Sequence, residues 1–113
     1  MHLTQLDAFG LTLAVESLGA MALAPAFQLK RRDAVLAAVV ASTMTHPQVW
    51  LWFNTLYAQF GDLTTPYIEA AVFVAEAPFY RYLAGARWTE AFLLSLLINA
   101  ASWWAGELIY ALL

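Results

Sequence analysis

Acidic and polar residues interrupt the long apolar stretches of this chain, and they are its best candidates for chemistry. Six of them could build a functional site: Glu16, His46, Glu69, Glu76, Asn99 and Ser102. Carboxyl, imidazole, amide and hydroxyl groups can exchange protons or bind a polar ligand. The same groups can also hold apolar helices together by hydrogen bonds, with the acids protonated, and this structural role is the more common one.

The spacing of these residues indicates that several of them meet. Glu69 and Glu76 are seven residues apart, so a helix places them on one face. Glu16, His46, Glu76 and Asn99 fall at similar depths in their apolar stretches and can meet at the axis of a bundle. Because buried charge usually faces a bundle interior or a cavity, the cluster predicts either a structural hydrogen-bond network or a proton-titrating or ligand-binding centre.

His46 has two interpretations. It precedes Pro47, which removes a backbone hydrogen bond, so the imidazole and nearby hydroxyls can satisfy freed backbone groups. Alternatively, His46 is a ligand of a chlorin or a haem, although haem is usually held with a second axial ligand. We expect no required cofactor and no metal site.

No enzyme class is indicated. The chain contains no G-x-S-x-G nucleophile motif, no H-E-x-x-H metal pair and no Gly-rich phosphate loop. It has no cysteine, which excludes disulfides and thiolate chemistry.

Four apolar stretches must position the candidate residues. They cover roughly residues 8–27, 34–57, 66–83 and 88–112, and each is close to the ~20 residues that a helix needs to cross the hydrocarbon core. The chain is 63% apolar and 12% charged, with a mean hydropathy of +0.66, whereas soluble domains are about 25% charged. We therefore predict an all-α integral membrane protein whose 113 residues form one four-helix transmembrane bundle.

The basic residues predict the topology. All five lie in two short clusters: Lys30, Arg31 and Arg32, then Arg81 and Arg87. Since Lys and Arg collect on the cytoplasmic side of membranes, the first and third connections should be cytoplasmic, with both termini outside. A bacterial inner membrane is the expected location. Tyr80, Tyr82 and Trp88 are expected at the inner interface, and nucleic-acid binding is not expected.

The two halves of the chain look related. A shift of 57 positions aligns Ser42 with Asn99, and a shift of 60 aligns Glu16 with Glu76. Two hairpins of the same orientation would form a parallel repeat about an axis along the membrane normal. We therefore predict that the bundle consists of two related helical hairpins.

One resemblance rests on two short runs. Residues 42–50, STMTHPQVW, together with residues 99–102, NAAS, resemble a diffuse set of uncharacterised small four-helix bacterial membrane proteins. Those carry Asn-x-x-Thr-His-Pro in the second helix and Asn-x-x-Ser in the fourth. Ser42 stands where their first Asn would be. The resemblance implies the four-helix layout and no activity.

A second resemblance centres on Glu16. In the run 13–19, LAVESLG, Glu16 is similar in position to the essential glutamate in helix one of the small multidrug-resistance transporters, which have four helices and a similar length. The resemblance implies a homodimer that exchanges protons for a cation. The chain departs from that pattern because the third and fourth stretches lack the Gly-rich packing pattern, with only Gly106 in the fourth.

From its size, its apolar surface and its lack of catalytic motifs we predict a small accessory or structural subunit of a larger membrane complex. Its partners would be the lipid bilayer and other transmembrane subunits, with a hetero-complex favoured over a homodimer. Two alternatives stay open: a proton-coupled small transporter acting as a homodimer through Glu16, and a pigment- or haem-associated subunit using His46.

Overall fold

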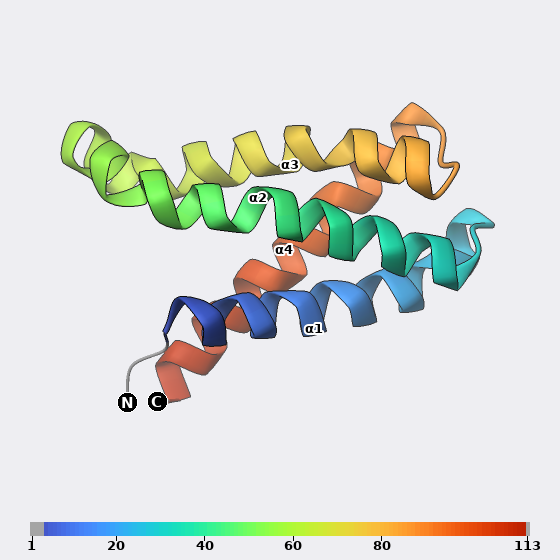
Figure 1. Cartoon of the computed structure of the whole chain (residues 1–113), viewed down its shortest axis with the longest axis horizontal. Helices are drawn as coiled ribbons and strands as arrows, with labels where there is room; N and C mark the ends of the chain where they lie inside the picture. The colour runs from blue at the N-terminus through green and yellow to red at the C-terminus, as the bar shows by residue number, and fades with distance from the viewer. Residues whose placement is uncertain (1–3, 113) are drawn as a thin grey trace.

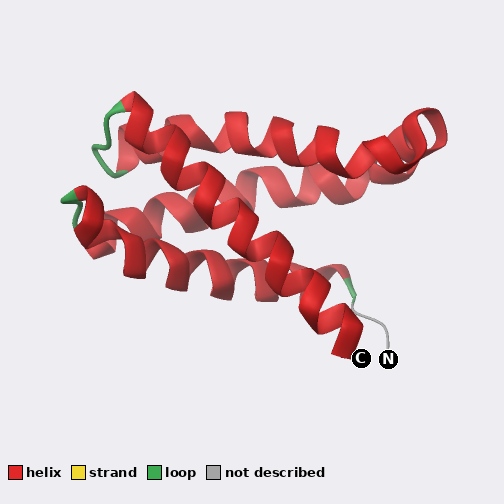
Figure 2. Ribbon diagram, turned by 180° about the vertical axis from the view of Figure 1, so that it is seen from behind, coloured by secondary structure: helices red, strands yellow, loops and turns green. Residues whose placement is uncertain are grey.

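The chain folds into four long helices. The computed structural model describes residues 4–112, apart from the side chain of Gln5, and all regular structure in this part of the chain is helical (Figure 1, Figure 2). The α-helices are α1 (Gln5–Leu23), α2 (Arg31–Phe60), α3 (Thr64–Leu83) and α4 (Trp88–Leu112), with short 3₁₀ turns η1 (Ala24–Phe27) and η2 (Gly61–Leu63). The prediction of an all-α bundle is confirmed at this level.

Three helical segments of the described chain are long and apolar enough to cross a membrane: Leu6–Phe27, Arg31–Leu83 and Trp88–Leu112. The middle segment of 53 residues contains α2, η2 and α3, which fold back on each other. Gly61, with φ of +59°, forms that reversal, and Gly85, with φ of +77°, follows α3. Glycine adopts this left-handed backbone without the steric cost that a Cβ would add.

Each helix packs against two others, in the pairs α1–α2, α2–α3, α3–α4 and α1–α4. Both termini and the α2–α3 reversal lie at one end of the bundle, and the other two connections lie at the opposite end (Figure 1). We call these the termini end and the basic end, because all five basic residues lie at or beside the second pair of connections. There Arg31 Nε donates to the carbonyl of Met21 (3.3 Å), and Arg81 Nη1 donates to that of Ala86 (3.2 Å).

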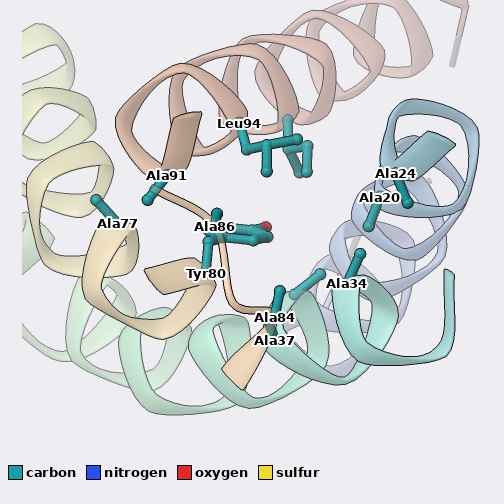
Figure 3. Packing of buried hydrophobic residues seen from close by; sticks show 12 residues of the cluster. Ala20, Ala24, Ala34, Ala37, Ala77, Tyr80, Ala84, Ala86, Ala91 and Leu94 are labelled. Atoms are coloured by element: carbon teal, nitrogen blue, oxygen red, sulfur yellow. The ribbon is translucent and has the colours of Figure 1, made fainter. Parts of the chain in front are cut away.

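The apolar core is built mainly from alanine and occupies the half of the bundle next to the basic end. Its buried members include Ala20, Ala24, Ala34, Ala37, Ala77, Tyr80, Ala84, Ala86, Ala91 and Leu94 (Figure 3). Small side chains let helix backbones approach closely, which is how helices pack where lipid supplies no hydrophobic drive. Toward the termini end, α4 crosses the bundle diagonally and leaves α3 (Figure 1, Figure 2). The described chain is therefore tightly packed in one half and opens in the other.

α2 continues as one helix through Pro47. Side chains beside the proline bond to backbone carbonyls one turn earlier. Thr43 Oγ1 donates to Val39 O (2.7 Å) and Gln48 Nε2 donates to Met44 O (3.2 Å). Neither acceptor is the carbonyl of Thr43, which is the group that Pro47 leaves without its backbone donor. Within residues 4–112 the structure therefore does not show the compensation that the structural interpretation of the His46-Pro47 pair predicts.

Candidate functional site

Three of the predicted site residues are buried where the tight half of the bundle meets the open half. Glu16 on α1 is 3% exposed, Glu76 on α3 is 1% exposed and Asn99 on α4 is 7% exposed. Each comes from a different helix, as the expected meeting at the bundle axis requires. His46, Glu69 and Ser102 lie around them in the wall of a cavity, so the structure brings the predicted set into one region.

The carboxyl group of Glu16 accepts a hydrogen bond from the neighbouring helix. Ser42 Oγ, on the neighbouring helix α2, donates a hydrogen bond to Glu16 Oε1. The hydroxyl of Ser102, on α4, also approaches this carboxyl group. Glu16 is thus hydrogen-bonded to a residue of its own hairpin and has a residue of the other hairpin nearby.

The carboxyl group of Glu76 is held in the same way. Asn99 Nδ2, on the neighbouring helix α4, donates to Glu76 Oε1 (2.8 Å). Thr45 Oγ1, on α2, lies 2.6 Å from Glu76 Oε2 and 3.0 Å from the carbonyl oxygen of Ala41, both within hydrogen-bond distance. Here too one contact comes from the same hairpin and one from the other.

Ser95 fixes the orientation of the Asn99 amide. Asn99 Nδ2 also donates to Ser95 O (2.8 Å) and lies 3.2 Å from Ser95 Oγ, while Ser95 Oγ donates to the carbonyl of Phe73 (2.7 Å). Since all partners of Nδ2 are acceptors, the amide oxygen must point elsewhere. Ser95 was not among the predicted site residues, although its i, i+4 spacing to Asn99 places both on one helix face.

No lysine or arginine within residues 4–112 pairs with either buried carboxyl group; the ion pair that the structure contains joins Arg32 to Asp33 (3.5 Å), at the basic end. A carboxylate taken out of water without a cationic partner is costly. The hydrogen bonds from Ser42, Thr45 and Asn99 offset only part of that cost. Neutrality of the site therefore requires a proton on the carboxyl group or a positively charged ligand beside it.

A cavity of about 250 Å³ adjoins these groups on the side of the termini end, and residues from all four helices line it. Its deep wall includes Ser42, Thr45, Glu76 and Asn99, and Glu16 lies behind Ser42. The exposure of its acids rises along the cavity, because Glu76 is buried, Glu69 is half-buried and Glu107 is exposed. The cavity thus connects the buried carboxyl group of Glu76 with the termini end.

His46 lines the same cavity. The ring of Phe9 stacks on its imidazole at 5.1 Å between centroids, and the ring of Trp50 lies at 6.2 Å. Nε2 is buried and has no hydrogen-bond partner among the residues that the structure describes. In the same part of the chain, no three His, Asp or Glu side chains gather in a way that could hold a metal ion. The chlorin or haem alternative stays a prediction.

Tyr80 lies in the alanine-rich core of the bundle, a position that the sequence did not reveal. We expected it at the inner interface beside Tyr82 and Trp88, but its side chain is fully buried, whereas Tyr82 is 74% exposed. It follows Glu76 by one helical turn, and its ring extends into the interior of the bundle among alanines (Figure 3). Its hydroxyl has no hydrogen-bond partner among the described residues. The i, i+4 spacing to Glu76 was the signal for this inward orientation.

No protein-family model matches this sequence, and comparison with curated proteins and with solved structures finds no match either. The two family resemblances of the sequence stay predictions.

Proposed function

We propose that the chain crosses a bacterial inner membrane four times, with the basic end in the cytoplasm and both termini outside. If the segment Arg31–Leu83 were one straight helix, it would be about 80 Å long, far more than the ~30 Å hydrocarbon core. Because α2 and α3 lie side by side, each can cross separately. The bundle is 41 Å along its longest axis, close to the ~40–45 Å of a bilayer with its headgroups.

The bundle consists of two related hairpins in this proposal, α1–α2 and α3–α4. The contacts that support it follow the shifts in the sequence. Ser42 binds Glu16 in the first hairpin as Asn99 binds Glu76 in the second. Thr45, which the shift of 57 aligns with Ser102, reaches across to Glu76 as Ser102 approaches Glu16. These corresponding neighbours from α2 and α4 support the proposal of two related hairpins.

The function that the geometry supports best is proton-coupled binding and transport of a small cationic solute. One observation carries this proposal: Glu76 lies at the base of an acidic cavity without a basic partner, and Glu16 lies directly behind the cavity wall. Intramembrane acids in such surroundings are usually part of substrate or proton pathways. Since one chain supplies Glu69, Glu76 and Glu107, it does not need a second copy to form a cavity with several acids.

The mechanism follows from charge neutrality. An empty site is neutral when its carboxyl groups hold protons, and a cation can replace a proton there without leaving a buried net charge. Binding of the cation therefore releases protons, and by linkage the affinity for the cation rises as the pH rises. The cavity connects this centre with the termini end, so in the described conformation the exchange takes place on that side.

Proton release tests this function. The purified chain in weakly buffered detergent solution is mixed with butylammonium chloride, and a pH indicator records the protons that are released. We expect release from the natural chain and its loss in Glu76→Gln. Asp62→Asn removes a carboxyl group at the same end but outside the cavity and should behave like the natural chain. A natural chain that releases no proton, or a Glu76→Gln variant that releases as many, would contradict the proposal.

An accessory-subunit role is the second candidate. An apolar groove of about 450 Å³ lies between α2 and α3, and its lining includes Met44, Trp52, Leu56, Ile68 and Phe79. Such a groove suits a row of side chains from a neighbouring transmembrane helix. Gentle extraction from the native membrane, followed by a native gel, tests this role: a larger complex of fixed composition supports it, whereas a chain that migrates alone contradicts it.

A further inference from the structure

Three acids and one amide oxygen supply hydrogen-bond acceptors in a cavity wall that also carries hydroxyl, imidazole and indole groups. Glu69, Glu76 and Glu107 contribute carboxyl groups. Asn99 is more than nine-tenths buried, and its Oδ1 accepts no hydrogen bond from any residue that the structure describes, because all contacts of the amide are made through Nδ2. No lysine or arginine lines the cavity. A ligand that carries N–H donors and positive charge therefore matches the acids and the amide oxygen of this wall.

Two acids of the wall lie at different depths on α3. Glu69 precedes Glu76 by seven residues on α3, two turns of helix, so their Cα atoms are about 10 Å apart along the helix axis. Both residues line the same cavity, and Glu76 is at its base. Two separate points of negative charge at different depths match an elongated ligand with a cationic group at each end better than a compact ligand with one charge.

The volume of the cavity agrees with an elongated, slender ligand. Its volume of about 250 Å³ equals that of about eight waters at ~30 Å³ each. Val49 and Val72 line it between the two acid levels and provide apolar surface against which a short methylene chain can pack. Along α3, the cavity wall therefore presents the carboxyl group of Glu69, then the apolar side chain of Val72, then the carboxyl group of Glu76.

We propose that the solute is a linear aliphatic diamine or polyamine, whose two ammonium groups bind at Glu76 with Asn99 Oδ1 and at Glu69. This inference rests on the proposed function and names the substrate class of the same site. The ammonium group at the base replaces the missing basic partner of Glu76. The second ammonium group at Glu69 gives the site its preference for diamines over monoamines.

Calorimetric titration of the purified full chain in detergent tests the preference. Putrescine is compared with butylamine, which has the same carbon chain and one ammonium group. A charge-assisted hydrogen bond in a partly dry site makes putrescine about tenfold tighter. Glu69→Gln should lower the affinity for putrescine about tenfold, to the level of butylamine, and Asp62→Asn should keep the preference.

Equal affinities for putrescine and butylamine would overturn the inference. The same holds if Glu69→Gln and Asp62→Asn bind putrescine equally well. Because Glu69 is half-buried, its amide variant should fold, and circular dichroism verifies this. If butylammonium still releases protons but no diamine preference exists, the substrate class is wrong and the proposed function stands. If no ammonium ion releases protons, the proposed function itself is wrong.

Discussion

Asn99 is the side chain on which the position of the Glu76 carboxyl group depends most directly. Its amide donates to Glu76 Oε1 and is itself held by Ser95. Asn99→Ala removes that donor and leaves the buried carboxyl group with fewer partners. We expect the free energy of unfolding to fall by about 0.5–2 kcal/mol, the usual range for hydrogen bonds inside membrane bundles.

Reversible unfolding in mixed micelles measures this change. Asn54→Ala is the matched control because Asn54 is exposed on α2, and its replacement should change the free energy of unfolding little. If Asn99→Ala were as stable as Asn54→Ala, the Asn99–Glu76 bond would contribute nothing to the fold.

The residue types in the sequence indicated most members of the buried polar cluster, but not the residues that surround them. Glu16, Glu76 and Asn99 were expected to meet because they share a depth, and their burial agrees. The inward orientation of Tyr80 and the role of Ser95 were missed. The helices are apolar on nearly every side, so the amphipathic pattern that identifies an inward face in soluble proteins gives little information here. The depth of a residue in the bundle can be counted in the sequence from the end of its helix. The direction in which its side chain points about the helix axis depends on how the helices pack.

At the scale of elements, the alanine-rich half is what holds the helices together. Ala37 on α2 is fully buried, and there is no room beside it for a larger side chain in a closely packed interface. Ala37→Leu should lower the free energy of unfolding by about 1–3 kcal/mol through overpacking. Ala58→Leu, on the exposed outer part of the same helix, should be close to neutral. Equal unfolding curves for the two variants would show that this contact tolerates expansion.

The two hairpins are joined by a polar contact where the bundle begins to open. Thr45 on α2 bonds to Glu76 on α3, so Thr45→Val removes a link between the hairpins and should let the termini end spread. Because the chain has no cysteine, spin labels can be placed at Leu6→Cys and Tyr67→Cys, both exposed at that end. We expect a broader distance distribution in Thr45→Val. Thr55→Val, at an exposed position of α2, is the control and should leave the distribution unchanged.

At the scale of the whole molecule, the end of the bundle that carries the basic residues is also the end at which the helices pack most tightly. The five basic residues lie at the end where alanines pack the helices tightly, and the acidic cavity opens at the other end. A membrane orientation fixed by the basic residues would therefore also fix the side from which the cavity is loaded. The sequence indicates that orientation through its loops, but it does not indicate the cavity, which exists only because α4 leaves α3.

Labelling of single cysteines tests the orientation. Asp62→Cys lies in the α2–α3 reversal and Thr89→Cys lies in the first turn of α4 at the basic end. If basic residues stay cytoplasmic, a membrane-impermeant maleimide should label Asp62→Cys in cells whose outer membrane has been made permeable. It should reach Thr89→Cys only after the inner membrane is broken. The reverse pattern would place the cavity on the cytoplasmic side, and labelling of both cysteines before lysis would mean that the chain inserts in two orientations.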